Sequence, residues 1–134
     1  MKKLNLGISL GDPNGIGPEV IIKALSDERM YQMCNVTIFG AASILNYYKN
    51  IVKNPKFKIH PLSDWNNINQ KVPNVVDVIE DKIELQPGEA TEASGMVALK
   101  AVQSALEALK EGHIDALVTG PLNKHNIKVP EDSP

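Results

Sequence analysis

The chain has 134 residues, of which 43% are hydrophobic and 22% are charged, as in an ordinary globular domain. Its formal net charge of −2 implies no basic face, so we expect no nucleic-acid partner. Because no apolar run approaches membrane-spanning length and Cys34 is the single cysteine, we expect neither a membrane partner nor an internal disulfide. These features predict a cytoplasmic protein.

The first predicted element is a buried strand over residues 4–10, a short apolar run that stops at a glycine-rich loop. Pro18 and Glu19 follow the loop, and both residue types are favoured in the first turn of a helix. A strand–loop–helix junction of this kind exposes backbone N–H groups that can bind an anion. The spacing of the glycines matches neither the Walker loop nor G-x-G-x-x-G, and they can equally serve the turn alone.

The middle of the chain alternates between helical and extended patterns. Helices are expected over residues 18–29 and 41–51, with apolar faces made by Val20, Ile21, Ala24 and Leu25, and by Ile44, Leu45 and Tyr48. Strands are expected over residues 35–39, 57–60 and 74–80, with Pro61 ending the second of these. Turn formers fill residues 61–74, where Trp65 is expected to anchor the loop on the core.

The clearest predicted helix covers residues 91–111. Thr91 can cap its start, Gly112 stands where a helix ends, and apolar residues recur at three- and four-residue steps at Leu99, Val102, Leu106 and Leu109. A buried strand is expected over residues 114–119, followed by a turn. Alternating strands and helices predict an α/β fold with an open, mostly parallel sheet and helices on both faces.

Polar residues follow two of the predicted strands and define a candidate site. Parallel strands end at one edge of a sheet, so we expect both loops to lie side by side there. The candidate residues for a substrate or phosphate rim are Asp12, Asn14, Gly15, Gly17, Thr119, Asn123 and Lys124. Lys124 can neutralise a phosphate or carboxylate. The alternatives are an Asx turn at Asp12 and a helix cap at Asn123 beside a solvated Lys124.

No metal site is evident from spacing. His60, His113 and His125 do not show the spacing of metal ligands, and we expect none of them to bind a metal.

Two sequence blocks carry a resemblance to a known family. The first block is Gly-Asp-Pro-Asn-Gly-Ile-Gly-Pro-Glu at residues 11–19. The second runs from Gly88-Glu-Ala-Thr-Glu-Ala-Ser-Gly95 through a predicted helix to Ala116-Leu-Val-Thr-Gly-Pro-Leu-Asn-Lys124. Together they resemble the 4-hydroxythreonine-4-phosphate dehydrogenases of vitamin B6 (pyridoxal phosphate) biosynthesis. The isopropylmalate and isocitrate dehydrogenases have a shorter form of the first motif, without the residues here at Pro13 and Asn14.

The resemblance implies an isocitrate/isopropylmalate dehydrogenase-like fold. It also implies NAD-dependent oxidation and decarboxylation of 4-hydroxy-L-threonine 4-phosphate to 3-amino-2-oxopropyl phosphate, by a homodimer. A divalent metal (Zn, Mg or Co) would polarise the alcohol, held by histidines that the family carries after the second block. Residues 1–134 would then be the amino-terminal α/β portion of a longer two-domain protein, and this portion would be inactive alone.

Two other functions stay open. One is a related decarboxylating dehydrogenase that acts on another phosphorylated or β-hydroxy acid. The other is a phosphate-binding module without catalysis.

Overall fold

The computed structural model describes residues 3–80 and 83–122, and their strands form one parallel sheet in the order β3-β4-β2-β1-β5. The strands are β1 Leu4–Ser9, β2 Cys34–Gly40, β3 His60–Pro61, β4 Asn74–Asp77 and β5 Ala116–Thr119. Every pairing between them is parallel. The predicted parallel α/β sheet is therefore confirmed.

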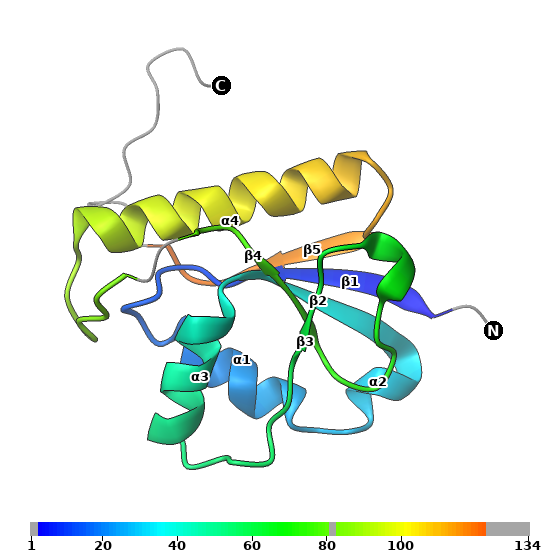
Figure 1. The fold of residues 1–134 in the computed structure, drawn as a ribbon, viewed down its shortest axis with the longest axis horizontal. Coiled ribbons are helices and arrows are strands. Elements are labelled where there is room, and N and C mark those ends of the chain that lie inside the picture. The colour runs from blue at the N-terminus through cyan, green and yellow to red at the C-terminus, as the bar shows by residue number, and fades with distance from the viewer. Residues whose placement is uncertain (1–2, 81–82, 123–134) are drawn as a thin grey trace.

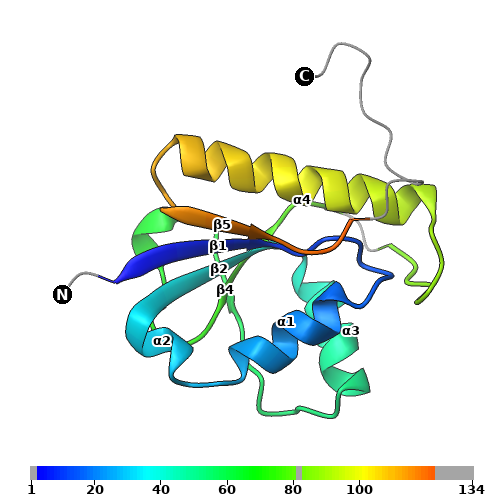
Figure 2. The ribbon, with the colours of Figure 1, turned by 180° about the vertical axis from the view of Figure 1, so that it is seen from behind.

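Helices cover both faces of this sheet. The helix α4 lies on one face, and α1 and α3 lie on the other (Figures 1 and 2). The helical elements are α1 Gly17–Leu25, α2 Met30–Met33, α3 Ala42–Ile51, the 3-10 turn η1 Trp65–Asn67, and α4 Glu92–Lys110. Because all strands run the same way, the ends of β1, β2, β4 and β5 meet at one edge of the sheet.

The core consists of two layers of apolar side chains, one on each face of the sheet. The larger layer lies under α1 and α3 and includes Ile8, Leu10, Ile22, Leu25, Val36, Ile38, Ile44, Leu45 and Tyr48. The smaller layer lies under α4 and consists of Phe39, Ala101, Ala105, Ala108 and Ile114. The inner face expected for residues 41–51 is confirmed, since Ile44, Leu45 and Tyr48 are all buried.

The buried face of α4 differs from the predicted one. Alanines at positions 98, 101, 105 and 108 face the sheet, whereas Leu106 and Leu109 are exposed. The sheet below is packed closely: a Cβ added to Gly7 in β1 would lie 2.4 Å from Ile114 Cδ1. Small side chains allow the helix to approach this surface, and the leucines therefore occupy the outer flank.

The first helix also differs from the prediction. It ends at Leu25 instead of continuing to residue 29, and Ser26 Oγ donates a 2.6 Å hydrogen bond back to Ile22 O. Ile22 is buried, whereas Val20 and Ala24 are exposed, so the predicted face was wrong at those two positions.

The predicted strand at residues 57–60 is displaced. Phe57 is buried in the core outside any strand, and Pro61 belongs to β3 instead of ending a strand before it. A proline is tolerated there because β3 is at the edge of the sheet, where an N–H group is not required. The next strand, β4, ends at Asp77 instead of residue 80.

The loop that carries Trp65 covers part of the face shared with α4. The Trp65 ring lies 6.2 Å from the Phe39 ring, centroid to centroid, and stacks on His113 at 4.6 Å with the planes 3° apart. Trp65 is therefore an anchor for the loop, as predicted.

Candidate functional site

The loops after β1 and β5 lie against each other at the carboxyl edge of the sheet (Figure 2). Asp12 N donates a 2.9 Å hydrogen bond to Pro121 O. Gly11 has φ of +80°, and a Cβ there would lie 2.6 Å from the same carbonyl oxygen. A side chain at this position would separate the loops. The expectation that the two motif loops share one edge is confirmed for the described residues.

Gly120 makes a second close contact between these loops. Its N–H donates to Ser9 O at 2.8 Å, and a Cβ at this position would lie 2.6 Å from Leu10 O. Gly17, the first residue of α1, is also buried at this contact, and a Cβ there would lie 3.1 Å from Leu10 O. Gly17 therefore packs against backbone.

Asp12 makes the Asx turn that the sequence left open as an alternative. Its Oδ1 accepts from Asn14 N at 2.9 Å, and its carbonyl accepts from Gly15 N at 3.0 Å. Asp12 is buried, and Gly15 is exposed. The N–H groups of Asp12, Asn14 and Gly15 are thus used inside the protein and are not available to bind an anion.

Tyr48 ties the same loop to α3. Its hydroxyl donates a 2.5 Å hydrogen bond to Pro13 O. Burial raises the pKa of the Tyr48 phenol to about 12, so it remains a neutral donor at ordinary pH. No pattern in the sequence indicated this contact.

A cavity of about 250 Å³ opens between the first loop, the turn before α4 and the loop after β5. Its lining residues are Asp12, Asn14, Gly15, Ile16, Gly88, Glu89, Ala90, Pro121 and Leu122. The lining includes two acidic residues, Asp12 and Glu89, and no lysine or arginine among the described residues. Within the described part of the chain, this cavity does not favour a phosphate group.

Two of the other candidate residues, Gly17 and Thr119, lie outside this lining. Thr119 is exposed at the end of β5, opposite Ser9 of β1 in the register. Asn123 and Lys124 lie outside the described residues. The structure therefore brings together Asp12, Asn14 and Gly15 of the predicted set, and it adds Glu89, Pro121 and Leu122.

The described residues do not by themselves form a site for a divalent metal. No group of three histidine, cysteine, aspartate or glutamate side chains among them is close enough to hold an ion. Asp12, one of the two carboxylates in the cavity, already accepts a hydrogen bond from its own loop. In residues 3–80 and 83–122, no helix is both long enough and apolar enough to cross a membrane.

Comparison with known proteins places the chain in a family. The family model of "Pyridoxal phosphate biosynthetic protein PdxA" matches residues 32–131, three quarters of the chain. The chain belongs to this family. It is 33% identical over 132 residues to the 4-hydroxythreonine-4-phosphate dehydrogenase of Bacteroides thetaiotaomicron, a match covering 98% of the chain and 36% of that relative.

Two further relatives extend the comparison of this PdxA-family chain. A Clostridium botulinum protein bearing the name D-threonate 4-phosphate dehydrogenase is 29% identical, over 92% of this chain and 37% of its own length. The crystal structure of a 4-hydroxythreonine-4-phosphate dehydrogenase from Burkholderia phymatum superposes with a TM-score of 0.82 at 29% identity, covering 94% of this chain and 38% of that one. The expected isocitrate/isopropylmalate dehydrogenase-like fold is confirmed. The chain spans little more than a third of the length of these relatives.

Sequence reasoning missed the residues that complete the cavity from the turn before α4. Gly88 has φ of +86°, so Pro87-Gly88 is a turn, and this dipeptide was the available signal. Nothing in the sequence indicated that the turn lies against Asn14, more than 70 residues earlier.

Proposed function

We propose that this chain contributes the amino-terminal portion of an NAD- and divalent-metal-dependent dehydrogenase. The reaction is the oxidation and decarboxylation of 4-hydroxy-L-threonine 4-phosphate to 3-amino-2-oxopropyl phosphate. Membership of the PdxA family supports the reaction class. The observation that carries the proposal is that both sequence blocks meet at one edge of the sheet, through the Asp12 N to Pro121 O hydrogen bond.

The charges in the cavity refine the assignment of residues. Because Asp12 and Glu89 are both acidic, we assign neutralisation of the substrate phosphate to Lys124, with Thr119 and Asn123 as further polar groups of the same rim. The metal ligands, the NAD contacts and the second domain would come from polypeptide outside this sequence. The complete protein would act in the cytoplasm as a homodimer whose active site draws on both subunits.

A related substrate is the second candidate. The Clostridium botulinum relative bears the name of a dehydrogenase for D-threonate 4-phosphate, which has a hydroxyl group where 4-hydroxythreonine 4-phosphate has an amino group. Both are phosphorylated hydroxy acids, so both fit the same reaction class. A phosphate-binding module without catalysis is the remaining alternative.

The test is a dehydrogenase assay on the complete gene product. We expect NADH formation from 4-hydroxy-L-threonine 4-phosphate, lost on treatment with a chelator and restored by divalent metal. The 134-residue chain alone should give no NADH above background. Faster turnover of D-threonate 4-phosphate would select the second candidate, and no turnover of either substrate would contradict both.

Lys124 provides a sharper test in the same complete protein. Lys124→Ala should lower kcat/KM for the phosphorylated substrate by about 100-fold while changing the melting temperature little, because a charge-assisted contact with the phosphate is lost. Lys49→Ala, on α3, is the matched control and should leave kcat/KM unchanged. If Lys124→Ala melts early and its folded fraction is fully active, Lys124 is structural.

A further inference from the structure

Residues 83–90 lead into α4, and residues 88–90 of this segment form one wall of the 250 Å³ cavity. Two apolar residues of this segment, Ile83 and Leu85, pack against the core. Among the described residues, all hydrogen bonds that join the segment to the rest of the chain are made with Asn14. One residue of the glycine-rich loop therefore holds the polar part of this wall.

Three hydrogen bonds make this connection. Gln86 N donates to Asn14 Oδ1 at 2.9 Å, and Asn14 Nδ2 donates to Glu89 O at 3.0 Å. Gly88 N donates to the backbone carbonyl of Asn14 at 2.7 Å. The same Nδ2 lies 3.5 Å from Thr91 Oγ1, the capping atom of α4. Asn14 is 3% exposed, and its side-chain amide bonds to Gln86 and Glu89 inside the protein.

We propose that Asn14 is a positioning residue that holds the wall at residues 88–90 against the glycine-rich loop and thereby sets the width of the cavity. Ligand affinity then depends on Asn14 through the position of residues 88–90. This inference rests on the proposed function in one respect, that the cavity receives part of the substrate.

The chemistry of the contacts explains why an amide is needed at position 14. The side chain must accept from Gln86 N and donate to Glu89 O at the same time. Aspartate keeps the first bond, but it places an acceptor against the Glu89 carbonyl and a second charge beside the Asp12 carboxylate. Alanine makes neither bond, and the wall is then held by Gly88 N and the apolar contacts alone.

Hydrogen exchange in the 134-residue chain tests whether Asn14 holds the wall. In Asn14→Asp we expect the amides of Gln86 and Gly88 to exchange at least about tenfold faster, because the introduced carboxylate cannot donate to Glu89 O and is repelled by the Asp12 carboxylate, which loosens the wall that carries both amides. The amides of Leu10 and Val78, which donate to Phe39 O and Gly40 O, should be unchanged and report on the sheet. Asn46→Asp, exposed on α3, is the matched control. Unchanged exchange at Gln86 and Gly88 would overturn the proposal.

Steady-state kinetics of the complete protein test the consequence for the ligand. Asn14→Ala should raise KM for 4-hydroxy-L-threonine 4-phosphate about tenfold, with kcat changed less than about threefold. A purely structural role would lower the melting temperature and leave KM unchanged. An unchanged KM beside faster exchange overturns the positioning role and leaves the proposed reaction standing. If the wild-type protein is inactive, the proposed function fails, and the exchange result still decides whether Asn14 holds the wall.

Discussion

The glycine-rich loop and the outer side of β5 differ in how many of their side chains and backbone groups contact the rest of the protein. Hydrogen bonds join the loop to three neighbouring parts of the chain. Tyr48 of α3 donates to Pro13 O, Asp12 N donates to Pro121 O after β5, and Asn14 bonds to the turn before α4. Beside β5, in contrast, large apolar side chains remain exposed: Val118 by 53%, Leu106 of α4 by 50% and Val20 of α1 by 55%. The part of the chain that the motif marks for ligand binding is the more rigidly built of the two.

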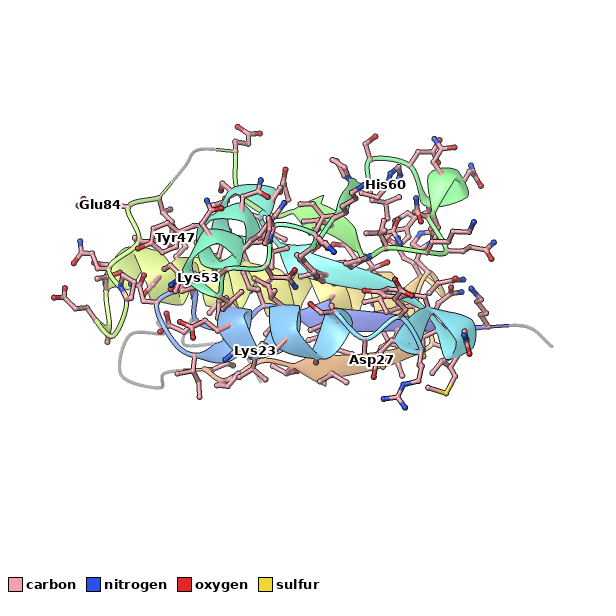
Figure 3. All side chains as sticks on the ribbon, turned by 90° about the horizontal axis from the view of Figure 1, so that it is seen from below. Lys23, Asp27, Tyr47, Lys53, His60 and Glu84 are labelled. Atoms are coloured by element: carbon pink, nitrogen blue, oxygen red, sulfur yellow. The ribbon has the colours of Figure 1, made fainter. Side chains whose placement is uncertain are left out.

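The two edges of the sheet extend this contrast. At one edge β3 has two residues, includes Pro61, and is joined to the η1 turn by a 3.0 Å contact between His60 Nε2 and Asn67 O. Seen from the side of α1 and α3, His60 lies at that edge, whereas Lys23 and Asp27 mark the side of β5 (Figure 3). A short strand with a proline ends a sheet, whereas a strand flanked by exposed apolar side chains is typical of an interface.

Gly120→Ala should have the largest effect on stability, because the added methyl group would disrupt the close contact between the glycine-rich loop after β1 and the loop after β5. The added Cβ would lie 2.6 Å from Leu10 O, a backbone atom that can move away only if the main chain shifts. We expect the free energy of unfolding in urea to fall by about 3 kcal/mol. Gly15→Ala, with a nearest contact of 3.4 Å, is the control and should cost well under half as much. Equal costs would mean that the close contact does not constrain the loops.

Tyr48→Phe tests the tie between the loop and α3. Loss of the hydrogen bond to Pro13 O should lower the free energy of unfolding by about 1 kcal/mol at pH 7. In the folded chain the Tyr48 pKa is raised to about 12 by burial, above the ordinary value of 10.0. The unfolded chain therefore ionises first, so the stability due to neutral Tyr48 is complete below pH 10 and is lost between pH 10 and 12.

The alkaline loss of stability should accordingly be smaller in Tyr48→Phe than in wild type. Tyr31 behaves in the same way, since burial also raises its pKa to about 12 and its hydroxyl donates to Leu25 O. In the double variant with Tyr31→Phe, the free energy of unfolding should depend even less on pH between pH 10 and 12. Identical pH profiles for all three proteins would show that neither phenol contributes.

Much of the fold could be predicted because its signals are local. Apolar runs located all the strands except β3, and Thr91 and Gly112 marked the ends of α4, where a capping box with Ser94 forms. The buried face of α4 could not be predicted in this way. Hydrophobicity favours Leu106 and Leu109 over alanine, but the distance between helix and sheet decides which side chains fit.

The candidate site was predicted less completely, for a related reason. The sequence identified Asp12 and Asn14 as polar residues after a strand, and parallel topology was enough to bring the loop after β5 beside them. The role of Asn14 depends on partners at Gln86 and Glu89, which are 72 and 75 residues away. No periodicity encodes such a pairing, so ligand contact and internal support could not be distinguished before the fold was known.

The two flanks of α4 also differ in how well their side chains are packed. One flank lines a cavity that Trp65 and His113 also line, with their rings stacked and His113 Nε2 3.2 Å from Glu111 Oε2. His113→Ala should lower the free energy of unfolding by about 0.5–1 kcal/mol, because a stacked ring contact is lost. Trp65 is the single tryptophan, so its fluorescence reports the change directly. His125→Ala is the control, and an unchanged emission spectrum in His113→Ala would contradict the stack.

Substitutions on the outer side of β5 should change stability least, but they should change self-association clearly. The exposed apolar residues there suit a further strand and helix, and the relatives are nearly three times as long as this chain. The 134-residue chain alone should therefore self-associate weakly through this side. Val118→Lys and Leu106→Glu should abolish that association in light scattering while changing the free energy of unfolding by less than about 0.5 kcal/mol. Ile51→Glu, an exposed apolar residue of α3 on the other side of the molecule, should leave it intact. A wild-type chain that stays monomeric at high concentration would show that the outer side of β5 is an ordinary surface.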